Sequence, residues 1–125
     1  MMEEKKKLIG YTKDLIDGCL HYMNADGTFH DVVNKPETFI EVNLSQMLAY
    51  SIFRGVSAGF LEQSYINKAE LMRKAANDRV DELGYIHDVC GCPNFDRSYF
   101  SPEAQAFYLL MEAAARDYAG KMYTR

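Results

Sequence analysis

Two histidine-aspartate pairs, His30-Asp31 and His87-Asp88, carry the residue types in this chain that suit proton transfer. They occupy the same position of a loop that occurs twice, as GTFHDVV beginning at Gly27 and as GYIHDVC 57 residues later. Each histidine could donate a hydrogen bond or exchange a proton near neutral pH, and the aspartate could orient its ring. Because a repeat duplicates structural loops as readily as functional ones, the pairs could equally brace the loops.

Two further polar residues, Glu41 and Asn43, flank the predicted start of the second helix. Main-chain N–H groups at a helix N-terminus attract anions, so a sugar carboxylate would suit this position. Glu41 could face a central cavity, but its spacing favours a capping acid that accepts hydrogen bonds from local N–H groups. Asn43 is predicted to cap the helix, and it could instead bind a ligand.

Loop residues in the second half of the chain could also recognise a sugar. The guanidinium group of Arg97 could bind a uronate carboxylate through two parallel hydrogen bonds, although a surface arginine is the simpler interpretation. Aromatic rings in loops can stack on sugar faces, or they can pack beneath the loop; Phe29, Phe95 and Tyr99 are of this kind.

A transition metal is the other ligand that the second loop could hold, through His87, Cys90 and Cys92. Structural zinc sites use two separated pairs of ligands, and this segment has only one Cys-x-Cys pair. The sequence therefore predicts neither a metal site nor a cofactor.

Four helices must position these groups. Apolar residues recur at helical spacing over about 3–23 and 66–83, with charged residues on the other face. The helices at 43–58 and from Ser101 to about residue 119 are nearly uncharged, and a helix that is apolar on all sides is expected to be buried on all sides. The order predicts two layers, in which outer amphipathic helices cover inner apolar ones.

The predicted fold is therefore all-α. The two outer-inner hairpins, at about 3–59 and 66–119, form one partial domain of an α/α toroid that spans residues 1–125. The segments 29–33 and 85–89 could form short ribbons.

Composition excludes several other classes of protein. The chain has 14 basic and 18 acidic residues, and its only basic cluster is Lys5-Lys6-Lys7, which disfavours nucleic-acid binding. No apolar stretch is long enough to cross a membrane, and no secretory signal is visible. Three cysteines are an odd number, and together these features predict a cytoplasmic protein.

Residues 27–61 resemble the C-terminal part of unsaturated rhamnogalacturonyl hydrolases, which are six-hairpin glycosidases of families 105 and 88. The family's loop G-x-[FW]-H-x-V-x-[DN]-x-P begins here at Gly27, and its R-G-V-x-x-G-x-L segment begins at Arg54. The family's E-T-[SN] step corresponds to Glu41-Val42-Asn43, where Val42 replaces the usual threonine.

The resemblance implies a toroid of six hairpins with the ligand in a funnel at the N-termini of the inner helices. These enzymes protonate the double bond of a 4,5-unsaturated galacturonyl residue at the end of a pectin-derived disaccharide. Water then adds, and the hemiketal collapses to release rhamnose. The resemblance implies that an unsaturated uronide would contact a set of five residues here: His30, Glu41, Asn43, His87 and Arg97.

The family's catalytic aspartate lies in an earlier hairpin, and its Arg-Gly-Asn-Gly-Trp motif is absent from this chain, which has no tryptophan. The resemblance thus implies a C-terminal fragment with two of six hairpins and no catalytic residue of its own. Two hairpins of a ring would expose inner-helix faces, so we expect a homo-oligomer, either a dimer or a trimer. The alternative is a non-catalytic helical-repeat module for protein interaction.

Overall fold

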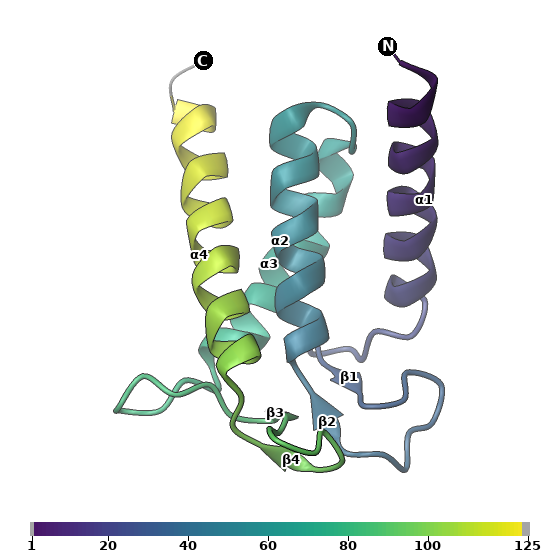
Figure 1. Cartoon of the computed structure of the whole chain (residues 1–125). Coiled ribbons are helices and arrows are strands. Elements are labelled where there is room, and N and C mark those ends of the chain that lie inside the picture. The colour runs from purple at the N-terminus through teal and green to yellow at the C-terminus, as the bar shows by residue number, and fades with distance from the viewer. Residues whose placement is uncertain (1, 124–125) are drawn as a thin grey trace.

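The computed structural model describes residues 2–123, which form an all-α fold, as predicted (Figure 1). The described residues contain the helices α1 (Glu3–Leu20), α2 (Asn43–Ala58), α3 (Ile66–Asn77) and α4 (Pro102–Tyr123), with a short 3-10 turn, η1 (Gln63–Tyr65), before α3. Two antiparallel ribbons lie at one end of the helices; they pair β1 (Phe29–His30) with β2 (Ile40–Glu41), and β3 (Val89–Cys90) with β4 (Ser98–Tyr99).

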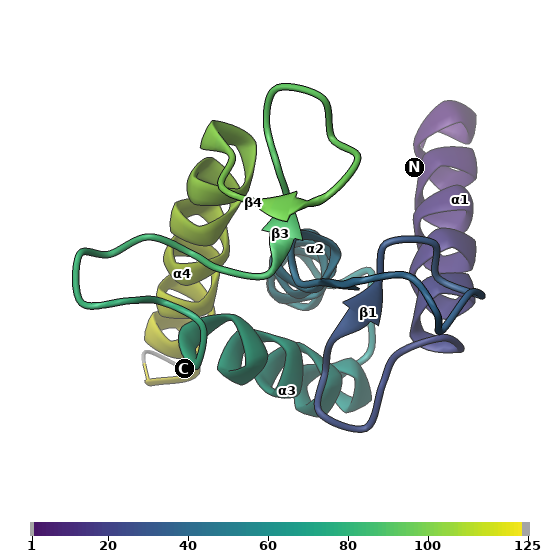
Figure 2. The ribbon, with the colours of Figure 1, turned by 90° about the horizontal axis from the view of Figure 1, so that it is seen from below.

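Helix α2 is the centre of the structure. It packs along both α3 and α4, whereas α3 and α4 contact each other much less. Figure 2, seen from below, shows α2 between α1 and α4, with α3 alongside. Helix α1 stands at the edge and contributes one fully buried side chain, Ile16, to the core. This arrangement has outer helices beside inner ones, as the sequence pattern predicts.

Local signals start and stop the two inner helices. Ser101 Oγ accepts a hydrogen bond from the N–H of Ala104 at 3.0 Å, and Pro102 occupies the first helical position of α4. Gly59 ends α2 in the left-handed conformation with φ of 86°, which glycine adopts without a steric penalty. The capping residue of α2 is Val42, so the prediction of Asn43 as the cap was wrong by one residue.

Both outer helices end earlier than predicted, at Leu20 and Asn77. After α3, the carboxylate of Asp81 accepts hydrogen bonds from the N–H groups of Leu83 and Tyr85, at 2.9 and 3.0 Å. This side-chain turn offers the backbone an alternative to the helix. It explains why α3 ends although the helical spacing of apolar residues continues in the sequence.

The repeated loop has the same backbone turn in both copies. Gly27 and Gly84 have φ angles of 88° and 90°, and each N–H donates to the carbonyl three residues earlier, of Asn24 and Asp81, at 3.0 Å. A turn of this kind needs a positive φ, which explains the glycine in each copy. The repeat read from the sequence therefore exists in the backbone.

The copies diverge after the turn. Phe29 enters β1, whereas its counterpart Ile86 forms an isolated bridge with Val80, and β3 begins only at Val89. Each ribbon pairs a strand with the segment that follows it. Residues 31–33 and 85–88, which the sequence suggested as parts of ribbons, lie outside the observed strands.

The prediction that both inner helices are buried on all sides was wrong. Met47 on α2 is 38% exposed, and Leu109 and Leu110 on α4 are 64% and 44% exposed. The described part of the chain has no element that covers this side of α4.

Candidate functional site

The loops that carry the predicted site residues lie together at the N-terminal ends of α2 and α4 (Figures 1 and 2). The first loop meets the second where the N–H of Val42 donates to the carbonyl of Asp88 at 2.8 Å. Asp88 has a φ of 57°, an uncommon conformation for a residue other than glycine. One end of the molecule thus gathers polar groups from two hairpins.

Glu41 joins the two loops. It is only 8% exposed; its Oε2 accepts the N–H of Leu44 at 2.9 Å, and its Oε1 accepts the N–H of Cys90 at 3.2 Å. Burial raises the pKa of this carboxyl, while the hydrogen bonds from the N–H groups of Leu44, Cys90 and Asn43 oppose the rise. Glu41 is therefore the capping acid that its spacing favoured, and it also ties the second loop to α2.

Asp31 and Cys90 form a contact between the loops that sequence reasoning missed. The pKa of the Cys90 thiol is raised to about 11 by burial, by the charge of Asp31 and by a hydrogen bond with that carboxylate. The thiol also donates a hydrogen bond to the carbonyl of Phe95 at 3.1 Å. No sequence pattern indicates this pair, because the contact depends on how two loops meet.

His30 is held by its own hairpin rather than by Asp31. Its Nδ1 lies 2.8 Å from the carbonyl oxygen of Thr38, in the segment that leads to β2. A carbonyl only accepts, so Nδ1 carries the proton, and Nε2 of the neutral ring is an acceptor. This tautomer could accept a hydrogen bond from a sugar hydroxyl.

His87 is oriented differently, although it occupies the equivalent position of the repeat. Its Nε2 donates to the carboxylate of Asp81 at 2.7 Å, and its ring packs edge-on against Phe100, with centroids 5.0 Å apart. The hydrogen bond from His87 lowers the pKa of Asp81, and N–H groups of Tyr85 and Leu83 lower it further. The neighbouring Asp88 binds the guanidinium of Arg79 instead, at 2.9 Å. Neither histidine is therefore oriented by the aspartate beside it in the sequence.

Arg97 lines a cavity of about 310 Å³ inside the β3–β4 hairpin, together with Cys92, Asp96 and Tyr99. Its Nε lies 3.1 Å from Asp96 Oδ1, and this hydrogen bond lowers the pKa of Asp96. The guanidinium is exposed, so its bond with Asp96 competes with water.

A second cavity, of about 330 Å³, has an aromatic wall and shares Cys92 and Tyr99 with the first. Tyr85 and Tyr99 flank Phe100, with centroids 5.5 and 5.2 Å from its ring. The two cavities thus adjoin at Cys92 and Tyr99, with Arg97 in the first and three aromatic residues, Tyr85, Tyr99 and Phe100, in the second. Tyr99 was among the aromatic residues that the sequence singled out.

Asn43 marks the junction of the two inner helices. Its Oδ1 accepts a hydrogen bond from Gln46 Nε2 at 3.1 Å, and the same amide donates to the carbonyl of Ala104 at 2.9 Å. Gln46 is fully buried, and its Oε1 has no hydrogen-bond partner among the described residues. This amide holds the N-termini of α2 and α4 together.

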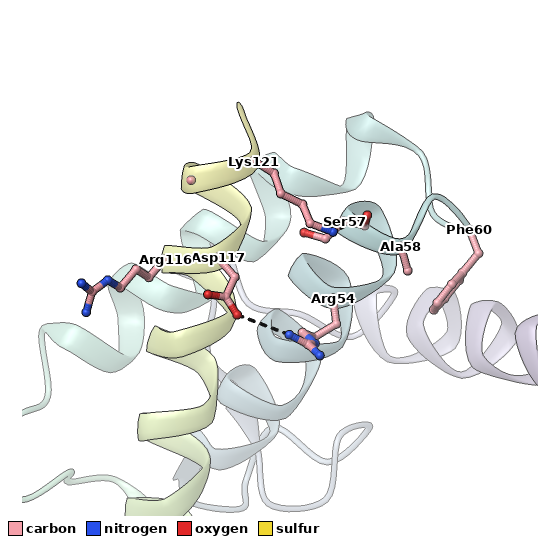
Figure 3. Close-up of a pocket in the computed structure, with 8 residues that line it drawn as sticks. Arg54, Ser57, Ala58, Phe60, Arg116, Asp117 and Lys121 are labelled. Atoms are coloured by element: carbon pink, nitrogen blue, oxygen red, sulfur yellow. Dashed lines mark hydrogen bonds and ion pairs between the residues drawn. The ribbon is translucent and has the colours of Figure 1, made fainter. Parts of the chain in front are cut away.

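A groove at the other end of α2 and α4 contains none of the predicted site residues (Figure 3). Its volume is about 740 Å³. Arg54 points toward Asp117 and forms an ion pair at 3.4 Å, while Lys121 Nζ donates to the carbonyl of Ser57 at 3.1 Å. These bonds tie the ends of the two helices together, and the groove offers no acid-base pair.

Among residues 2–123, no group of three or more His, Cys, Asp or Glu side chains is arranged to hold a metal ion. Cys90 and Cys92 are free thiols. Within the same range, every helix is too short or too polar to cross a bilayer.

The layers of outer and inner helices, with the loops gathered at the N-terminal ends of α2 and α4, define part of an α/α toroid. This is the class of fold that the sequence predicted. The profile of Glycosyl Hydrolase Family 88 matches residues 2–116, and the chain belongs to this family. No curated protein matches the sequence.

Two solved structures are similar to this chain. One is described as a possible member of the GH105 family from Salmonella enterica subsp. enterica serovar Paratyphi A str. ATCC 9150, with a TM-score of 0.78 and 20% identity. The other is a possible GH105 member from Klebsiella pneumoniae subsp. pneumoniae MGH 78578, with a TM-score of 0.76 and 18% identity. The matches cover 90% and 93% of this chain, but only 32% and 34% of those chains. The chain therefore spans about a third of the length of these structures.

Proposed function

We propose that this chain supplies part of the sugar-binding site of a glycoside hydrolase that acts on a 4,5-unsaturated galacturonyl residue of a pectin-derived disaccharide. The family match supports the glycosidase class, and the resemblance of residues 27–61 supports the substrate. The observation that carries the proposal is the juxtaposition of Arg97 with the aromatic cavity at the N-terminal ends of the inner helices.

Arg97 and Tyr99 provide the main contacts in this proposal. A planar guanidinium can form two parallel hydrogen bonds with a carboxylate, and the uronate would replace Asp96 as its partner. The ring of Tyr99, which is 60% exposed, lies in both cavities and can stack on the sugar face. His30 would accept a hydrogen bond from a sugar hydroxyl through Nε2, and His87 would border the aromatic wall.

Glu41 and Asn43 act as positioning residues. Both carboxylate oxygens of Glu41 already accept N–H groups, so it does not serve as the proton donor. The resemblance assigns that role to an aspartate upstream of the segment seen here. We therefore propose that this chain binds the sugar and does not hydrolyse it alone.

The free state of Cys19, Cys90 and Cys92 supports a reducing, cytoplasmic location for the protein.

Isothermal titration calorimetry with the unsaturated rhamnogalacturonan disaccharide tests the binding role. Arg97→Gln should weaken binding by about tenfold or more, because a charge-assisted contact is lost. Arg54→Gln is the matched control, since Arg54 is also exposed and paired with one aspartate, but lies at the opposite end of α2. Equal affinity of the Arg97→Gln variant and the unmodified chain would refute this site.

The ultraviolet absorbance of the substrate's double bond tests the catalytic part. We expect it to stay constant with this chain alone. A steady loss of absorbance would show that the chain contains a proton donor of its own.

A further inference from the structure

We infer that a second copy of this chain docks head to tail, with α1 of one copy against α4 of the next. Helices α1 and α4 lie on opposite sides of α2 (Figure 1), and the internal repeat indicates what would cover each of them. This inference does not depend on the proposed sugar-binding function.

Helix α1 has an exposed apolar position where α3 has a buried one. A shift of 57 residues superposes the turn glycines of the repeat, and it also superposes the last residues of α1 and α3, Leu20 and Asn77. Under this shift Leu15 corresponds to Met72. Met72 is fully buried in the core where α3 packs along α2, whereas Leu15 is 66% exposed. At this position, the surface that α3 uses to bind an inner helix is therefore uncovered on α1.

The neighbouring position confirms the correspondence. Arg73 on α3 points toward α4, where it binds Glu112 at 2.7 Å. Its counterpart on α1 is Ile16, which is 1% exposed and belongs to the core around α2. Each outer helix thus contacts the inner helix that follows it through this position. Among the described residues, no inner helix precedes α1.

Exposed residues on α1 have the spacing of a helix-packing seam. Leu8, Tyr11 and Leu15 are 65%, 66% and 66% exposed, at intervals of three and four residues. Residues at this spacing form one stripe along a helix, and an apolar stripe of this kind packs against another helix.

Helix α4 also has an uncovered side. A shift of 59 residues superposes the capping residues Val42 and Ser101, and in each helix the carbonyl of this residue accepts the N–H four residues later, of Gln46 and Gln105, at 3.1 Å. Under this shift, Tyr50 of α2, which is partly buried against the core, corresponds to Leu109, which is 64% exposed. Helix α2 is covered by the α3–α4 hairpin, while the equivalent side of α4 has no hairpin upon it among the described residues.

The two uncovered faces are complementary by the symmetry of the repeat. Within residues 2–123, α1 has no preceding inner helix and α4 has no following outer helix, so α1 of one copy can sit on α4 of another as α3 sits on α2. A contact between two different faces is heterologous, and it closes into a ring when the rotation permits. Since the chain spans about a third of the similar toroids, three copies should close the ring. Each loop end would then border the loop ends of its neighbours and complete the funnel.

Sedimentation equilibrium of the purified chain tests this inference. We expect a mass three times the 14.3 kDa of one chain at micromolar concentration or above. Leu15→Lys and Leu109→Lys should each open the ring, whereas Leu83→Lys, in a loop and 78% exposed, should leave the mass unchanged. Circular dichroism should show the same helix content in all four proteins, because these side chains are exposed.

Mixing the two variants distinguishes a contact between α1 and α4 from a contact between two identical faces. Leu15→Lys retains an intact α4 face, and Leu109→Lys retains an intact α1 face, so an equimolar mixture should form a heterodimer. Dimerisation of only one variant by itself would indicate contact between identical faces and would overturn the inference. A monomeric unmodified chain at about 0.1 mM, roughly a hundred times a micromolar Kd, would also overturn it.

Discussion

The two turn glycines, Gly27 and Gly84, offer a matched pair of substitutions in one chain. Their φ angles are 88° and 90°, so alanine at either position meets the same backbone penalty, about 1 kcal/mol. The surroundings differ. A Cβ at Gly27 would lie 2.7 Å from the carbonyl oxygen of Leu71, whereas a Cβ at Gly84 would have no atom within 4 Å.

Gly27→Ala must therefore shift the backbone of the first loop or of α3 as well. Overpacking of this kind costs typically about 2 kcal/mol. We expect Gly84→Ala to lower the free energy of unfolding by about 1 kcal/mol and Gly27→Ala by about 3 kcal/mol.

Urea unfolding followed by circular dichroism, at one protein concentration, measures the difference. With a slope of about 2 kcal/mol per molar urea, the two midpoints should differ by about 1 M. Equal midpoints would refute the close approach between the first loop and α3. A greater loss of stability in the Gly84→Ala variant would contradict the finding that Gly27 is the crowded glycine and Gly84 the open one.

Three further outcomes follow from the loop contacts. Glu41→Ala leaves the N–H groups of Leu44 and Cys90 without their acceptor, so the free energy of unfolding at pH 7 should fall by about 2 kcal/mol, measured by urea unfolding; an unchanged midpoint would contradict the bridging role. The pKa of Glu41 is higher in the folded state than its ordinary value of 4.5, so its contribution to the free energy of unfolding should be fully present below pH 4.5 and should be lost as pH rises through the folded-state pKa. This decrease should be smaller in Glu41→Ala. An identical pH profile of the two proteins would count against the raised pKa. With a pKa of about 11, Cys90 should react slowly with iodoacetamide at pH 8, and Asp31→Asn should speed the reaction when peptide mass spectrometry follows that site; equal rates in both proteins would remove Asp31 as a cause.

The sequence predicted what depends on local chemistry. The glycines of the repeated turn, the Ser101-Pro102 helix start and the apolar α2 and α4 each reflect a residue's own backbone preference or its helical spacing. Helix ends were less predictable. Asp81 competes for the backbone N–H groups after α3, and the strength of that competition cannot be read from helical periodicity.

Contacts between loops were beyond sequence reasoning. His87 is oriented by Asp81 and not by Asp88, and Asp31 meets Cys90 across the two hairpins. Both pairings depend on how the loops are placed in three dimensions. The exposed Leu109 shows a related limit, because composition marks a helix face as apolar but does not tell whether the same chain or another copy covers it.

The central claim is that the loop end of this family 88 chain recognises an unsaturated uronide, and amide chemical shifts test it most directly. Titration of the ¹⁵N-labelled chain with the unsaturated rhamnogalacturonan disaccharide should shift the signals of Arg97, Tyr99 and residues around His30. Signals near Arg54, at the far end of α2, should stay in place. Shifts confined to the Arg54 groove, or no shifts at millimolar sugar, would contradict the claim.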